Sequence, residues 1–249
     1  MATVTLPKNF DSNAIAFDSV KKNNMGGKVV YMKYNGQSKL TLQTPLMSSP
    51  FGISAYTDKD TDITKYSLDV SFKGLEDNPK IQEFYDKMQQ FDNSLIEAGV
   101  KNSKDWLGKP MKADVVDALY RPLVKPSKDP EKYAPTIKFK IPSKDGKLIV
   151  TAYDHEKQPF DVDNLLPGTK VQALIEASSI WFVNKQFGVS WKLVQLFVSK
   201  PEKLAGFSFV NDDDEMDAES DEDTAQDLGC DIITDDPETE TGDGMNEVE

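Results

Sequence analysis

One amphipathic helix pattern interrupts a chain that is otherwise patterned for β-strands, and this order constrains the fold more than any other feature. Apolar residues recur at helical spacing between Asn78 and Gly99. Asn78 suits an N-cap, Pro79 suits the first helical position and Gly99 suits the stop, which predicts a helix over 78–98. Strands and helices do not alternate regularly along the chain, so a doubly wound parallel sheet is disfavoured.

Two β-patterned blocks flank this helix. An Asn-Gly pair at 35–36 joins the first two strands and is typical of a hairpin turn, because both residues tolerate positive φ. The main strands predicted in the two blocks cover 28–34, 39–44, 66–72, 136–141, 148–154, 170–183 and 189–199. We expect a mainly β protein of the α+β type, with a small closed barrel or curled sheet and a helical insert at about 78–121.

The charge of the chain is divided between a basic body and an acidic end. The net charge is −13, but 18 of the 42 acidic residues lie in 212–249, which has no Lys or Arg. Residues 1–211 therefore hold 24 acidic against 29 basic residues, a net charge of +5. The predicted organisation is a flexible N-terminal segment (1–27), a folded domain (28–210) and a disordered acidic tail (211–249).

The rarity of His and Cys excludes several kinds of site. With only His155 and Cys230, the chain has no Cys/His zinc cluster and no internal disulfide. His155 lies in a predicted turn and is interpreted as a surface residue, so we expect no catalytic residues, no metal and no cofactor. The lone Cys and the lack of a signal segment or apolar span predict a soluble intracellular protein in a reducing compartment, without a membrane partner.

Lysines interleaved with aromatic residues indicate a single-stranded nucleic-acid site. Bases stack on aromatic rings at roughly 1–3 kcal/mol per base, while ammonium groups follow the phosphates. The body has one Arg against 28 Lys, and Arg is the usual reader of guanine edges, so sequence-specific reading of a duplex is disfavoured. For Trp181 and Trp191 a core position stays open. The predicted nucleic-acid contacts are Tyr31, Lys33, Lys138, Lys140, Trp181, Lys185, Phe187, Trp191 and Lys192.

The acidic tail is expected to have a function because it is attached to a basic body. A polyanion attached to a basic groove competes with nucleic acid at high effective concentration, and once displaced it is free to recruit partners. A purely solubilising tail is the simpler alternative. The predicted partner-binding residues are Asp212, Asp213, Asp214, Glu215, Asp221, Glu222 and Asp223.

The segment Ser179–Val198 (SIWFVNKQFGVSWKLVQLFV), with Leu204–Val210 (LAGFSFV) ahead of the tail, resembles the single-stranded DNA-binding proteins of large DNA viruses of algae and protists. These are similar to the gene-2.5-type proteins of phage. The resemblance implies an OB-fold-like antiparallel barrel with a helix between its third and fourth strands. It also implies a role in viral DNA replication, recombination or repair, with a tail that contacts DNA polymerase, helicase or primase. The implied locations are host cytoplasm, nucleus, viral replication site or virion.

One departure from the family concerns the end of the tail. The phage proteins finish on an aromatic residue that helps the tail compete for the groove, whereas this chain finishes at 246–249 with Asn-Glu-Val-Glu. Competition by this tail is therefore expected to be electrostatic.

The leading hypothesis is a non-enzymatic single-stranded DNA-binding protein. A virion, scaffold or chaperone-like protein whose acidic tail binds basic partners is the alternative from another class. A duplex-binding architectural protein is disfavoured by the lack of Arg. The sequence is compatible with a homodimer and fixes neither the oligomeric state nor a preference for DNA over RNA.

Overall fold

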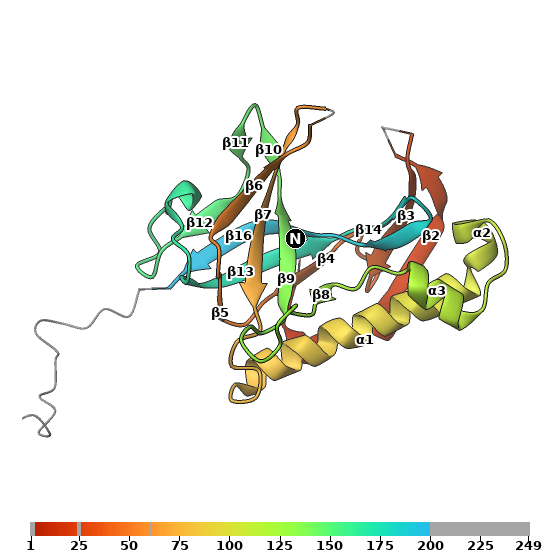
Figure 1. The fold of residues 1–249 in the computed structure, drawn as a ribbon, viewed down its shortest axis with the longest axis horizontal. Helices are drawn as coiled ribbons and strands as arrows, with labels where there is room; N and C mark the ends of the chain where they lie inside the picture. The colour runs from red at the N-terminus through yellow and green to blue at the C-terminus, as the bar shows by residue number, and fades with distance from the viewer. Residues whose placement is uncertain (1–2, 24–25, 60, 200–249) are drawn as a thin grey trace, which may run out of the picture. The chain divides into compact units, whose positions relative to one another are not determined.

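The structure, a computed structural model, describes residues 3–23, 26–59 and 61–199 (Figure 1). The predicted acidic tail lies outside these residues, together with every predicted partner-binding residue. The helices are η1 (Pro7–Asn9), η2 (Ser12–Ala14), α1 (Pro79–Lys101), α2 (Ser103–Leu107), α3 (Ala113–Leu119) and η3 (Val162–Asn164).

The described residues form sixteen strands, several of them only two residues long. They are β1 (Val4–Thr5), β2 (Ile15–Lys22), β3 (Lys28–Tyr34), β4 (Leu40–Gln43), β5 (Met47–Ser48), β6 (Ile53–Thr57), β7 (Thr64–Ser71), β8 (Val124–Lys125), β9 (Thr136–Ile141), β10 (Ser143–Lys144), β11 (Lys147–Leu148), β12 (Thr151–Tyr153), β13 (Lys170–Ala177), β14 (Ser179–Val183), β15 (Gln186–Val189) and β16 (Trp191–Val198). The predicted strand over 148–154 is thus shortened to β12, and Leu148 at its start belongs to β11.

Five strands close into a barrel in the order β13–β5–β7–β9–β16, with β16 pairing back onto β13. A small five-stranded barrel is the OB-fold architecture, so the predicted fold class is confirmed. Two details of the prediction are wrong. The β9–β16 pair is parallel, whereas the other pairs of the circuit are antiparallel. The helix α1 follows β7 and precedes β9, which places it between the second and third barrel strands rather than the third and fourth.

A second sheet of four strands, β15–β14–β3–β2, lies beside the barrel. Its edge strand β2 comes from the segment 1–27, which we expected to be flexible. That expectation is wrong for the described part of the segment, because Ile15, Phe17 and Val20 pack against the hydrophobic core. Their alternation with polar residues is interrupted by a bulge between Phe17 and Val20, which hides the β pattern in the sequence.

The two strands predicted over 170–183 and 189–199 form one long hairpin, which is divided between the two sheets. Its inner half pairs β13 with β16 in the barrel, and its outer half pairs β14 with β15 in the four-stranded sheet. Ser178 and Ser190 mark the points where the two halves separate. Because of this division, β14 and β15 belong to the four-stranded sheet and not to the barrel.

The turn at Asn35-Gly36 forms as predicted, with both residues at positive φ. Tyr34 and Gln37 exchange the two backbone hydrogen bonds that close it. The two strands it joins do not continue as a hairpin, however. β3 pairs with β2 and β14, whereas β4 pairs with β1 and β13. The turn chemistry was therefore readable from the sequence, but the strand partners were not.

The helix α1 runs along one side of the barrel toward α2 and α3 (Figure 1). Its start is as predicted: the Asn78 side chain accepts hydrogen bonds from the backbone N–H groups of Lys80 and Ile81, and Pro79 opens the helix. Its apolar stripe is buried against the body and comprises Ile81, Phe84, Met88, Phe91 and Leu95.

The predicted stop at Gly99 is wrong, because α1 continues to Lys101. Gly99 is needed for another reason. A Cβ at this position would lie 2.8 Å from the ring of Phe187 and 2.9 Å from a methyl group of Val116. Gly99 therefore lets α1 approach the four-stranded sheet and α3 closely, at the usual cost of a glycine inside a helix.

Candidate nucleic-acid interface

A groove of about 460 Å³ lies beside β9, and we call it the barrel groove. It carries four cationic side chains and one large aromatic ring, and no acidic side chain among the described residues lines it. Its lining residues are Arg121, Pro122, Leu123, Val124, Lys125, Pro126, Lys138, Lys140, Trp181, Val189 and Ser190. The sequence-predicted contacts Lys138, Lys140 and Trp181 are thus brought together, from two strands far apart in the chain.

The floor of the barrel groove is the outer face of β9. Ile137, Phe139 and Ile141 point into the barrel and are buried, so the alternate residues Lys138 and Lys140 point outward. The alternation in 136–141 therefore separates a core face from an outward face.

The two floor lysines differ in their partners. Lys138 donates to the buried Asp69 carboxylate and to the Ser67 hydroxyl on β7, so its charge is partly neutralised. Lys140 forms no ion pair with any residue of the described chain. Desolvation, and to a lesser extent the nearby Lys65, lowers the pKa of Lys140 below its usual range. An anion placed beside Lys140 would relieve both effects.

One wall of the barrel groove is the segment 121–126, and a buried carboxylate fixes its beginning. Asp92 on α1 accepts a hydrogen bond of 2.6 Å from the Tyr120 hydroxyl and one of 3.2 Å from the backbone N–H of Leu123. Burial raises the pKa of Asp92 from 3.8 to about 6, although these two hydrogen bonds act in the opposite direction. The helix thereby holds the wall that carries Arg121 and Lys125.

Arg121, the only arginine, is fixed in this wall by the outer hairpin. Its backbone N–H donates to the carbonyl of Phe187, and its Nε donates to the Gln186 side chain at 2.9 Å. A guanidinium has five N–H donors, so most of them remain for an anionic ligand. Within the described chain, Arg121 has no carboxylate partner.

Another part of the lining is the indole of Trp181 on β14. Trp181 lies across from Gly188 on β15, and a Cβ at Gly188 would be only 2.9 Å from the indole. Gly188 therefore gives the ring its place against the strand. The indole Nε1 is buried without a hydrogen-bond partner in the described structure, so a ligand would meet the ring rather than the N–H group.

Four other predicted contacts are exposed but do not line the barrel groove. Tyr31 and Lys33 lie on β3 of the four-stranded sheet, where Lys33 forms a 2.8 Å ion pair with Asp18. Lys185 lies in the turn between β14 and β15. Lys192 on β16 is paired with Lys140 across the parallel ladder, so it extends the basic face next to the barrel groove.

The remaining two predicted contacts, Phe187 and Trp191, are corrections. Both side chains are fully buried, so neither can stack on a base in this structure. Phe187 packs against Trp106, Tyr120 and Phe182. Trp191 is buried in the core with its ring edge-on to Phe91 of α1, as its alternation with Val189 and Leu193 allowed. Phe187 was expected at the surface because it is near a turn, but Gly99 opens space for its ring in the core.

Sequence reasoning missed Arg121 and Lys125. Arg121 directly precedes Pro122 and Lys125 directly precedes Pro126, between the strands predicted over 66–72 and 136–141. A basic residue beside each of two prolines was the available signal. Pro122 and Pro126 restrict the backbone and favour an extended wall over a helix.

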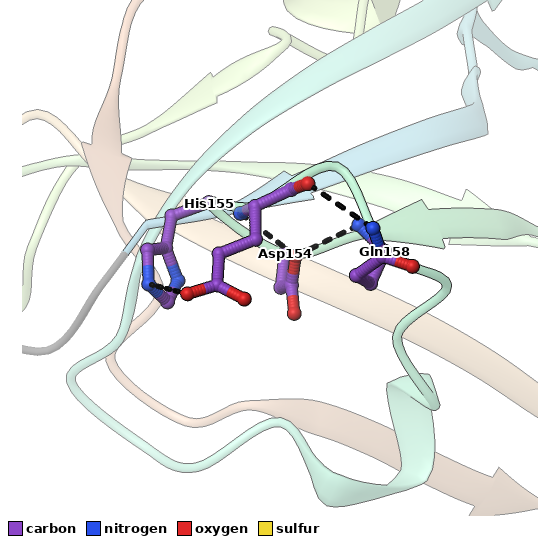
Figure 2. A network of polar contacts seen from close by, with 4 residues as sticks. Asp154, His155 and Gln158 are labelled. Atoms are coloured by element: carbon purple, nitrogen blue, oxygen red, sulfur yellow. Dashed lines mark hydrogen bonds and ion pairs between the residues drawn. The ribbon is translucent and has the colours of Figure 1, made fainter.

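The only histidine lies at the surface, as predicted. His155 is exposed in a turn where the Asp154 side chain accepts hydrogen bonds from the backbone N–H groups of Glu156 and Gln158 (Figure 2). Its Nε2 is 3.7 Å from the Glu156 carboxylate. Among the described residues, no group of three or more His, Cys, Asp or Glu is arranged to hold a metal ion.

The fold and the barrel groove together define an OB-like β protein with a cationic groove and an aromatic wall. The chain belongs to the family described as "Family of unknown function (DUF5871)", whose model matches residues 68–210. That range contains every residue lining the barrel groove. Among curated protein sequences, none matches the chain. Within the described residues, no helix combines the length and apolarity needed to cross a membrane.

Solved structures similar to this chain include two phage proteins. The single-stranded DNA-binding protein from bacteriophage Enc34, in complex with ssDNA, is 12% identical with a TM-score of 0.40, and the match covers 76% of this chain and 98% of that one. The single-stranded DNA-binding protein gp2.5 of bacteriophage T7 is 15% identical with a TM-score of 0.42, covering 68% and 90%. Both likenesses are distant, and the function proposed below stands on the barrel groove itself.

Proposed function

We propose that the protein is a non-enzymatic single-stranded DNA-binding protein and that the strand binds in the barrel groove. The main observation behind this proposal is that Lys140, Arg121 and Lys125 line one groove together with Trp181. No acidic side chain of the described residues lines this groove. The lysine ammonium groups and the planar arginine guanidinium donate hydrogen bonds to phosphate oxygens. The indole ring can stack on a base. OB folds commonly bind oligonucleotides on the face of their second and third strands, which here are β7 and β9.

The shape of the site favours a single strand over a duplex. An indole wall stacks on a base whose face is open, and bases in a duplex are already stacked on each other. No helix of the described structure lines the barrel groove, so no recognition helix is presented to a major groove there. The protein would therefore bind with little sequence preference and with strong dependence on salt.

We propose that the acidic end of the chain affects the binding of DNA to the barrel groove. Residues 212–249 carry 18 carboxylates on the same chain as the barrel groove, which raises their effective concentration there. We infer that residues such as Asp212, Asp213 and Glu215 compete with the phosphates, and that DNA releases them for DNA polymerase, helicase or primase.

The biological setting is part of the proposal. The resemblance of Ser179–Val198 and Leu204–Val210 supports a relationship with the single-stranded DNA-binding proteins of large DNA viruses of algae and protists. A role in viral DNA replication, recombination or repair would follow from that relationship. The protein would act inside the host cell, in its cytoplasm, its nucleus or a viral replication site.

Fluorescence anisotropy tests the proposal directly. A labelled oligo-dT is titrated with the full-length protein and with a truncation ending at Val210, at several salt concentrations and against a duplex competitor. We expect the single strand to be preferred, and the truncation to bind more tightly. The logarithm of the association constant should fall linearly with the logarithm of the salt concentration.

Two results would contradict the proposal. No binding by either form at low salt would make the barrel a protein-interaction module, as in the virion, scaffold or chaperone alternative. A preference for the duplex would make the protein an architectural DNA binder.

A further inference from the structure

A second hollow of about 740 Å³ adjoins the barrel groove, and we call it the loop pocket. It has a strongly exposed aromatic ring on each of two loops: Phe51 is 64% exposed and Tyr133 is 67% exposed. Its lining residues are Ser48, Pro50, Phe51, Ser71, Lys73, Lys125, Pro126, Ser127, Lys132, Tyr133, Ala134, Thr136 and Gly168. Single exposed apolar residues are ordinary, but apolar side chains gathered around one hollow are typical of an interaction site.

Both rings are presented by well-fixed backbone. Phe51 precedes Gly52, which has φ 64° and lies so close to the Leu165 carbonyl that a Cβ would be 2.6 Å from its oxygen. Tyr133 follows a turn closed by hydrogen bonds from its own N–H to the Asp129 carbonyl and from the Asp129 N–H to the Ser127 hydroxyl. Their exposure is therefore a property of the fold rather than of a loose loop.

The loop pocket continues the barrel groove along β9. Lys125 and Pro126 line both hollows. On the outer face of β9, Lys140 and Lys138 line the barrel groove, and the next outward residue, Thr136, lines the loop pocket. From Lys140 to Thr136 the strand rises roughly 13 Å, at about 3.3 Å per residue. One extended ligand can therefore lie along both hollows.

The charge of the loop pocket suits a polyanion. Lys73 and Lys125 have no ion pair within the described structure, whereas Lys132 is 3.4 Å from the Asp129 carboxylate. Beyond Tyr133 the surface changes sign, because an adjoining hollow is lined by Glu76, Asp77 and Glu131. A polyanionic ligand is thus favoured as far as Tyr133 and disfavoured beyond it.

We propose that Phe51 and Tyr133 form a second stacking segment of the binding site, so that one nucleic-acid strand runs from Lys140 past Lys125 to Tyr133. This inference rests on the proposed function, since it extends the same single-stranded site. Phosphates contact Lys125 and Lys73, and bases stack on the two exposed rings. The acidic surface past Tyr133 sets the end of the strand path.

Photocrosslinking separates this inference from the function on which it rests. Full-length protein is irradiated with an oligo-dT of about 16 nucleotides that carries 5-iododeoxyuridine, and crosslinked peptides are mapped by mass spectrometry. We expect crosslinks both at Trp181 and at Phe51 or Tyr133. Crosslinks at Trp181 alone overturn the second segment and leave the proposed function intact. Absence of crosslinks at both places overturns both.

Affinity measurements give an independent test. The double variant Phe51→Ala/Tyr133→Ala should bind the 16-mer about tenfold or more weakly, because two stacking contacts are lost. An oligonucleotide of about 4 nucleotides, which the barrel groove can hold alone, should bind the variant and the parent alike. Tyr133→Phe keeps the ring and should keep the affinity, and Val115→Ala, an exposed position on α3 outside both hollows, is the control for surface changes.

Two results of this test would overturn the inference. The first is an unchanged affinity of the double variant for the 16-mer, with its thermal unfolding also unchanged. The second is tighter binding by the double variant, which would mean that the loop pocket holds a competing segment of the protein instead of DNA.

Discussion

The barrel groove and the surface of β2 and β3 carry the same sequence pattern, lysines interleaved with aromatic residues, but their structures differ. In the barrel groove, Arg121, Lys125 and Lys140 have no carboxylate partner in the described chain and face a common hollow. On the surface of β2 and β3, Lys33 is paired with Asp18, and the Lys21 ammonium lies 5.7 Å from the centre of the Tyr31 ring. Lys33 and Lys21 of the second surface thus already have partners within the protein.

The difference shows what distinguishes a surface suited to an anionic ligand from a solvated one. The hydrogen bond from Lys33 lowers the pKa of Asp18, because it favours the ionised carboxylate. Desolvation lowers the pKa of Lys140 instead, because its charge has no partner to compensate the loss of water. A strand of phosphates would gain little on the first surface and more on the second.

The largest expected effect comes from Phe187→Ala, which tests whether this residue belongs to the core rather than to the binding surface. Removing a fully buried phenylalanine costs about 3–5 kcal/mol of unfolding free energy. Urea unfolding followed by circular dichroism measures this loss. If the variant kept its unfolding free energy but bound DNA more weakly, Phe187 would be a DNA contact and not a core residue.

The next effect concerns the anchor of the groove wall and depends on pH. Because the pKa of Asp92 is raised to about 6, its proton stays bound in the folded state at pH values where the unfolded chain has released it. The stability from this carboxyl is complete below about pH 4 and is lost as the pH rises through 6, a change of about 3 kcal/mol. Asp92→Asn should remove this slope.

Urea unfolding of the parent and of Asp92→Asn at pH 4, 5, 6 and 7 checks this prediction. The difference between the two proteins isolates Asp92 from the other carboxylates. Parallel stability profiles over this range would show that Asp92 does not titrate as described.

A smaller effect is expected from Trp181→Ala in the wall of the barrel groove. Loss of one stacking ring should weaken oligo-dT binding by about 1–3 kcal/mol. Trp181→Phe keeps a ring and should recover part of the affinity, while Tyr31→Ala on the other surface should leave it unchanged. Thermal unfolding of each variant shows whether the change also removes packing of the indole against Gly188, which would lower the unfolding temperature, or only the stacking on DNA.

The smallest effect is expected from Lys33→Ala, which removes an exposed ion pair. Exposed pairs of this kind contribute about 0–1 kcal/mol, so the unfolding free energy should change by no more than that. DNA affinity should stay the same, measured by anisotropy at low salt. A clear loss of affinity would place the DNA on the β2 and β3 surface.

Much of the fold was predictable from local signals. These signals depend only on residues close together in the sequence. They are the Asn78 cap, the apolar stripe of α1, the Asn35-Gly36 turn and the alternation in 136–141. The edge strand β2 was not predictable, because a bulge breaks its alternation. The pairing of β3 with β2 rather than β4 was also hidden, since strand partners depend on which faces meet in the core.

The site was predictable only in part, for a similar reason. Lys138 and Lys140 could be assigned to an outward face because their neighbours on β9 are apolar. Burial of Phe187 depends on space left by Gly99, 88 positions earlier in the chain, and no local pattern encodes that contact. Phe51 and Tyr133 lie in proline-bounded loops, where an aromatic residue follows no alternation.

The most direct test of the central claim compares charge removal on the two surfaces. Anisotropy of a labelled oligo-dT over a salt series is measured for Arg121→Ala/Lys125→Ala/Lys140→Ala and for Lys21→Ala/Lys22→Ala/Lys33→Ala, each with three fewer positive charges. We expect the first to bind weakly, with its salt slope reduced by about 2, and the second to bind as the parent does. Loss of binding in the second variant with the first unaffected would contradict a binding site in the barrel groove.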